Sequence, residues 1–102
     1  MEWEDKVKLV QLGNQRHESP EAKKEFQEYV ITNVQNFDAQ AWSMFSELTD
    51  IFPDEMKQDV EYWKTIHPHV KKAADCDDRF GLRAAMRIEL ILIVCKKDLN
   101  LT

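Results

Sequence analysis

Glycine and proline are scarce in this sequence, with two glycines and three prolines among 102 residues. Because both residues mark turns, their scarcity disfavours an all-β fold of many short strands. Charged residues make up 32 % of the chain and hydrophobic residues 43 %, which excludes the composition of a disordered protein. We therefore expect a single domain over residues 1–102, long enough to bury a core without a disulfide or a structural metal.

Cysteine and long apolar runs are scarce as well. The two cysteines, Cys76 and Cys95, are too few for a disulfide framework. No apolar run approaches the roughly 18 residues of a membrane span, and the polar first residues lack the apolar core of a signal peptide. We expect a cytoplasmic protein that does not bind membranes.

Basic charge is in deficit, since the net charge is −5, and this deficit disfavours direct binding of nucleic acid. The charge is unevenly spread: residues 17–61 hold 11 acidic and three basic residues, whereas residues 62–102 hold five acidic and eight basic ones. Two interpretations are open. The two halves pair with each other, or the acidic half docks on a basic protein, such as one that binds nucleic acid.

Helical periodicity is the strongest positive signal. Apolar spacing and capping residues predict helices over about residues 2–15, 20–36, 39–49, 53–66 and 77–97. Ser19 and Asp38 are predicted N-caps. The apolar stripe of the first helix is predicted to contain Trp3, Val7 and Val10, and Pro68 is predicted to end or kink the fourth helix. The pattern predicts an all-α fold, a compact antiparallel bundle of about five helices with a central, very apolar C-terminal helix.

The last predicted helix, over residues 77–97, is apolar on two sides. Its β-branched residues would also suit a strand, but its length and its helix formers favour a helix. One face carries the predicted core residues Phe80, Ala84, Ile88, Ile91 and Cys95. The second face carries Leu82, Met86, Leu90 and Ile93. A helix that is apolar nearly all round is either central in its own fold or shared with a partner or a second copy, so a homodimer is one prediction.

Three arginines, Arg79, Arg83 and Arg87, recur every four residues and form a stripe beside that second face. Guanidinium groups match phosphate and carboxylate geometry. The stripe therefore either binds an anionic ligand such as a nucleotide, or pairs with acidic helices of the same chain.

Catalytic and metal-binding motifs are absent from the sequence. It contains no phosphate-binding glycine loop, nucleophile elbow or zinc-protease motif. His67, His69 and Cys76 have no second ligand pair at a zinc-finger spacing, and we interpret them as polar residues of an interhelical loop. We expect no metal, no cofactor and no enzyme activity, although a small oligomeric enzyme built around the arginine stripe is an alternative.

The function we expect is that of a non-enzymatic protein-binding module. Small inhibitors, immunity or antitoxin proteins and phage anti-defence proteins fit this description, and no motif is specific enough to place the chain in a family. The partner would contact an acidic helical face made of Glu47, Asp50, Asp54, Glu55, Asp59 and Glu61, and an apolar face made of Leu82, Met86, Leu90 and Ile93. A structural subunit of a larger assembly is a further alternative.

Overall fold

The computed structural model describes the backbone of residues 2–48, 53–74 and 82–100, and the side chains of residues 2–48, 56–73, 89–97, 99 and 100. The elements in chain order are α1 (Trp3–Gln15), α2 (Pro20–Asn33), the 3₁₀ helix η1 (Val34–Asn36), α3 (Ala39–Leu48), α4 (Pro53–Gln58), α5 (Val60–Ala74) and α6 (Leu82–Asp98). No strand occurs in these ranges. The predicted all-α fold is confirmed.

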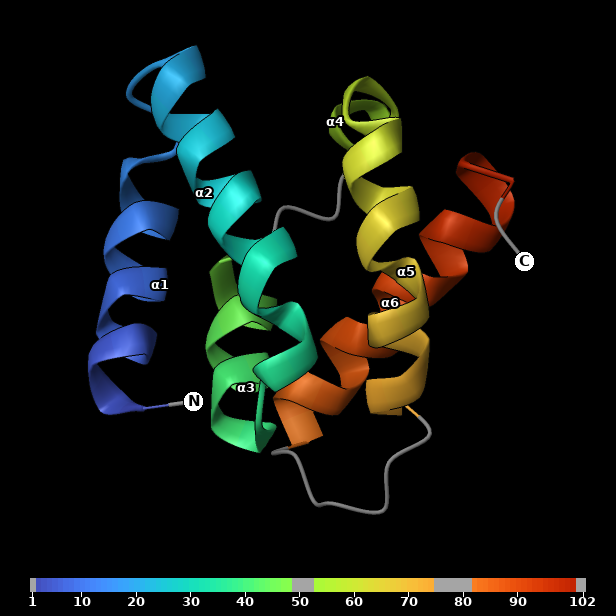
Figure 1. Ribbon diagram of the computed structural model, residues 1–102. Coiled ribbons are helices and arrows are strands. Elements are labelled where there is room, and N and C mark those ends of the chain that lie inside the picture. The colour runs from blue at the N-terminus through green and yellow to red at the C-terminus, as the bar shows by residue number, and fades with distance from the viewer. Residues whose placement is uncertain (1, 49–52, 75–81, 101–102) are drawn as a thin grey trace.

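Figure 1 shows how the helices are arranged. The antiparallel pair α1 and α2 forms one side of the molecule, and α3 packs against α1. On the other side α6 crosses behind α5, and it also contacts α3 and α4. The radius of gyration is 12.8 Å, close to the roughly 13 Å of a compact domain of 100 residues.

Local capping explains where α2 and α3 begin. The Ser19 hydroxyl accepts a hydrogen bond from the Ala22 N–H at 3.1 Å, and Pro20 occupies the first turn, where its missing N–H costs nothing. The Asp38 carboxylate accepts one from the Ala41 N–H at 2.8 Å. Both predicted caps are therefore confirmed, because they depend on residues close together in the chain.

The prediction of one helix over residues 53–66 is wrong in two respects, because the helix is interrupted and because it ends later than predicted. The chain turns at Asp59, where the N–H donates to the Met56 carbonyl at 3.0 Å, so that α4 and α5 are separate helices. From there α5 runs through Pro68 to Ala74. Its inner face buries four residues at helical spacing, Trp63, Ile66, Val70 and Ala73. Packing of this stripe outweighs the loss of one backbone hydrogen bond at an exposed proline.

The core joins all the helices. Its largest fully buried side chains come from all six α-helices that the structure describes and include Leu9, Val30, Phe45, Met56, Ile66 and Ile91. The Trp42 and Phe45 rings meet edge to face with centroids 5.7 Å apart, a favoured aromatic geometry. Trp42 and Trp63 are both buried.

The predicted apolar stripe of α1 is wrong. Trp3 is 60 % exposed and Val7 is 38 % exposed, whereas Leu9 and Leu12 are buried. Two stripes compete on this short helix, and the packing partners α2 and α3 select the one that carries the leucines. This orientation also buries Lys6, an outcome that hydrophobic periodicity does not predict.

The central position that was predicted for the last helix is not shown by the part of α6 whose side chains the structure describes. Ile91 and Cys95 on its inner face are fully buried, as expected, but Leu90 and Ile93 lie half exposed on the outside. The predicted core residues Phe80, Ala84 and Ile88 lie outside the described side chains. Within the described ranges, no helix is long and apolar enough to cross a membrane.

The buried Lys6 side chain makes polar contacts with two residues at the start of α3. Its ammonium lies 2.8 Å from the Asp38 carboxylate and 2.9 Å from the Gln40 side-chain oxygen. Burial by itself would raise the pKa of Asp38, but hydrogen bonds from Lys6 and from the Ala41 N–H outweigh it and hold that pKa below its ordinary value. The stabilisation from the charged carboxylate is therefore complete above the unfolded-state pKa of about 4 and is lost as the pH falls through the folded-state pKa.

We expect Asp38→Asn to lower the free energy of unfolding at pH 7 by about 1 kcal/mol, since asparagine keeps the cap but removes a half-exposed charge. The difference from wild type should shrink below about pH 4. Urea titrations from pH 3 to pH 7 measure it, with the exposed Glu25→Gln as the control. A difference that stays constant across this range would contradict the assigned pKa direction.

Candidate functional site

The predicted acidic face is described at three of its six positions. Glu47 and Glu61 are exposed at the end of α3 and the start of α5. Asp59 is half-buried, and the Lys23 ammonium lies 2.7 Å from its carboxylate, so most of its charge is balanced within the protein. Glu61 lies 3.9 Å from the Lys64 ammonium in an exposed pair, which contributes little. Asp50, Asp54 and Glu55 lie outside the described side chains.

The predicted apolar face is described at two of its four positions. Leu90 is 44 % exposed and Ile93 is 49 % exposed, and their spacing of three residues makes them neighbours on one side of α6. Glu89, Lys96 and Lys97 beside them are exposed. We call Leu90 and Ile93 the outer face of α6. Leu82 and Met86 lie outside the described side chains.

The arginine stripe also lies outside the described side chains, at Arg79, Arg83 and Arg87. Anion binding there stays a prediction.

The two histidines discussed as ligands do not lie in a loop as interpreted from the sequence. His67 and His69 are both in α5, and two residues two positions apart on a helix point to different sides. Burial and the nearby Lys71 lower the pKa of His67. Among the described side chains, no three His, Cys, Asp or Glu residues gather as metal ligands would.

The thiol of Cys95 lies fully buried on the inner face of α6. Burial raises its pKa to about 11, so it is protonated at neutral pH. A thiol in that state is a poor nucleophile, in agreement with its predicted role as a small core residue.

A pocket that sequence reasoning missed lies where the end of α1 meets α2, α4 and α5. Its volume is about 180 Å³. Three of the residues that line it are buried members of the core, Phe26, Met56 and Trp63. The others are polar or half-exposed, namely Arg16, His17, Lys23, Gln27, Gln58, Asp59 and Tyr62. The pocket thus combines an apolar floor with a polar rim, as ligand sites commonly do.

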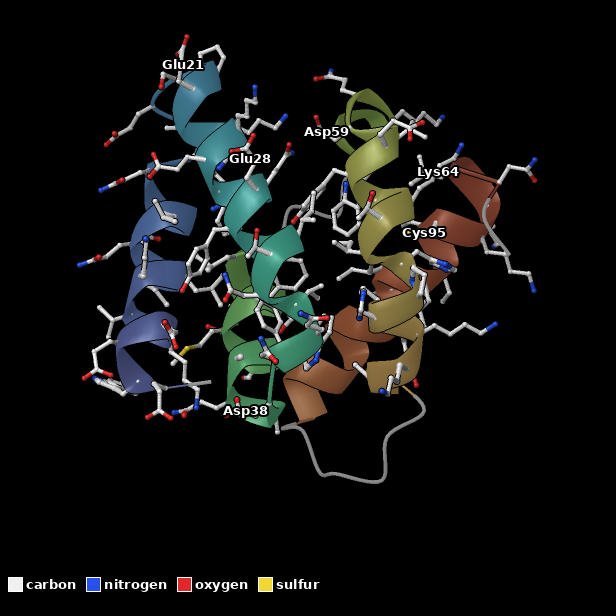
Figure 2. All side chains as sticks on the ribbon, in the orientation of Figure 1. Glu21, Glu28, Asp38, Asp59, Lys64 and Cys95 are labelled. Atoms are coloured by element: carbon white, nitrogen blue, oxygen red, sulfur yellow. The ribbon has the colours of Figure 1, made fainter. Side chains whose placement is uncertain are left out.

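One ion pair and one arginine organise the rim. Lys23 on α2 reaches Asp59 at the start of α5, and Figure 2 shows Asp59 at that end of the helix, on the side near α2. The Arg16 guanidinium donates to the carbonyls of Gly13 and Leu48, and lies 5.7 Å from the centroid of the Phe26 ring. These contacts fix two cations and one carboxylate beside the aromatic floor.

Tyr62 completes the rim with a neutral hydroxyl. Burial raises its pKa well above the ordinary value of a phenol, and the Asp59 carboxylate adds to the shift while Arg16 opposes it. Its ring meets the Trp63 ring edge to face, with centroids 5.3 Å apart. The hydroxyl therefore acts as a hydrogen-bonding group and not as a base.

The comparisons with known proteins give no relative. No family model, curated protein or solved structure matches the chain.

Proposed function

We propose that the protein is a non-enzymatic protein-binding module. The observation that best supports this proposal is the outer face of α6, where Leu90 and Ile93 lie side by side and half exposed while Ile91 and Cys95 behind them are fully buried. Adjacent large apolar side chains left in water favour a contact that covers them. Burial of both against a partner would contribute about 1–2 kcal/mol to binding.

The acidic surface would guide the approach of the partner. Glu47 and Glu61 are exposed, and the whole chain carries a net charge of −5. Negative charge of this kind speeds the encounter with a basic protein and selects against acidic ones, more than it adds affinity. Inhibitors, immunity or antitoxin proteins and phage anti-defence proteins are the types of module that act through such surfaces.

The test is a comparison of variants in affinity capture from lysate of the native host. We expect wild type to retain one stoichiometric protein, and Leu90→Ser with Ile93→Ser to weaken its binding about tenfold. The triple variant Glu47→Lys, Glu55→Lys and Glu61→Lys should bind more slowly and lose the salt dependence of association. Glu25→Lys on α2, outside both faces, is the control.

Binding rates are then measured with the purified partner at low and high salt, after thermal unfolding has verified that each variant folds. Retention of the partner at wild-type affinity by both the serine and the lysine variants would contradict the proposal. An effect of Glu25→Lys equal to one third of that of the triple variant would show that only net charge matters, because the single variant makes one third of the charge change, and this result would contradict a defined acidic face.

A further inference from the structure

The pocket between α2 and α5 is independent of both docking faces except for Asp59. Its three buried lining residues supply two aromatic rings and a thioether, from Phe26, Trp63 and Met56. Aromatic rings and methionine sulfur both pack favourably against an aromatic ring. The floor of the pocket therefore suits a flat, apolar group better than a sugar or a phosphate.

The volume limits the size of that group. A cavity of about 150 Å³ holds one benzene ring, and this pocket measures about 180 Å³. A nucleotide or another ligand of drug size needs at least about 300 Å³. One six-membered ring with a short substituent is the largest group that fits.

The polar groups on the rim determine which substituent on the ring would bind best. The Lys23 ammonium has three protons to donate, and the one contact described for it is with the Asp59 carboxylate. The side-chain amides of Gln27 and Gln58 lie at the same pocket. Of the charged residues described at the pocket, Arg16 and Lys23 are cations and Asp59 is a carboxylate. Donors of this kind favour an acceptor group that carries negative charge.

We propose that this pocket binds a single aromatic ring that carries a carboxylate, with the ring against Phe26, Met56 and Trp63 and the carboxylate at the Lys23 ammonium. A free aromatic acid has this chemistry, and so does the C-terminal aromatic residue of a peptide. Asp59 repels the carboxylate from one side, so the ligand approaches Lys23 from the side away from Asp59.

The three tryptophans make the test specific. In ¹H–¹⁵N NMR spectra of the full chain, the indole signal of Trp63 reports on the pocket, whereas Trp42 in the core and the exposed Trp3 on α1 are internal controls. We expect phenylacetate to shift the Trp63 signal saturably, with a dissociation constant on the order of 1 mM. The same titration is made with benzyl alcohol, cyclohexanecarboxylate and the dipeptide acetyl-Ala-Phe.

Three outcomes of this titration would overturn the proposal. The first is no saturable shift of Trp63 with any compound. The second is benzyl alcohol binding as tightly as phenylacetate, because the carboxylate would then have no role. The third is cyclohexanecarboxylate binding as tightly, because the ring would then need no aromatic character. Tighter binding of the dipeptide than of phenylacetate supports the proposal and identifies a protein C-terminus as the source, and the reverse order identifies a free acid.

Exposed Gln58 on the rim offers variants that leave the core untouched. We expect Gln58→Lys to tighten and Gln58→Glu to weaken phenylacetate binding by about threefold each, with little effect on benzyl alcohol. Lys23→Met should weaken phenylacetate binding about fivefold, while Lys24→Met, at the neighbouring exposed lysine of α2, should leave it unchanged. Equal phenylacetate affinity in the two Gln58 variants would overturn the assigned place of the carboxylate.

Discussion

Replacement of Pro68 by alanine is expected to stabilise the protein by about 2–3 kcal/mol. Pro68 is exposed near the middle of α5, so its side chain contributes little packing. A proline there removes one N–H from the helix and crowds the carbonyl four residues earlier, whereas alanine restores the hydrogen bond without an added side-chain entropy cost. For a domain of this length the change corresponds to a rise in melting temperature of about 10 °C or more.

Thermal and urea unfolding of Pro68→Ala measure this effect, and Pro20→Ala is the matched control. Pro20 occupies the first turn of α2, where proline is tolerated because its N–H has no helical partner. We expect Pro20→Ala to change stability by about 0.5 kcal/mol or less. A Pro68→Ala variant no more stable than wild type would mean that the backbone of α5 around residue 68 is not that of a regular helix.

The same proline shows why the ends of helices could be predicted only in part. Ser19 and Asp38 cap helices through bonds to the N–H three residues later, so the sequence suffices to find them. Pro68 also predicts locally that the helix ends or kinks. The helix continues nevertheless, because Ile66 and Val70 on the inner face of α5 are fully buried. The local preference of a proline against a helix amounts to a few kcal/mol, and the free energy gained by packing a buried apolar stripe exceeds it.

The face that a helix buries was predictable only where one apolar stripe dominates. Phe26 and Val30 on α2 are buried as their spacing predicts. On α1 the stripe of Trp3 and Val7 competes with that of Leu9 and Leu12, and the choice depends on contacts with α2 and α3 that lie far away in the chain. Trp3 is left 60 % exposed as a result.

The pocket was not predictable, because it has no motif. Its lining extends from Arg16 to Trp63 and comes from the residues that follow α1 and from α2, α4 and α5, so the residues meet only after these helices pack. The Lys23–Asp59 pair joins positions 36 residues apart, and nothing in a single sequence indicates such a pairing. The apolar pattern of α6 left two interpretations open, a central helix or a face shared with a partner or a second copy, and the structure adds that Leu90 and Ile93 are half exposed.

Arg16 is the residue for which we expect the largest loss of stability among the polar side chains. Its guanidinium donates to the Gly13 carbonyl near the end of α1 and to the Leu48 carbonyl at the end of α3, and it lies over the Phe26 ring. Carbonyls in the last turn of a helix have no helical donor, and a cation there also complements the helix dipole. One side chain thus joins two helix ends to α2.

We expect Arg16→Met to lower the free energy of unfolding by about 2–4 kcal/mol. This is less than the full sum of two charged hydrogen bonds and one cation–π contact, because Arg16 is partly exposed to solvent. Arg16→Lys should recover less than half of this loss, because an ammonium cannot reach two carbonyls with the planar fork of a guanidinium. Lys24→Met on α2 is the control, since its ammonium is exposed and 4.0 Å from Glu28. Urea unfolding measures all three variants.

The order of stability of these variants distinguishes the contribution of the planar guanidinium from that of its positive charge. If Arg16→Lys were as stable as wild type, a positive charge near the helix ends would suffice and the fork would have no role. If Arg16→Met were also as stable, neither carbonyl would depend on Arg16. Because Arg16 also lines the pocket, the expected order of wild type, lysine and methionine in stability should recur in the affinity for phenylacetate. Removal of the guanidinium takes one cation from the rim and leaves the Lys23 ammonium paired with Asp59.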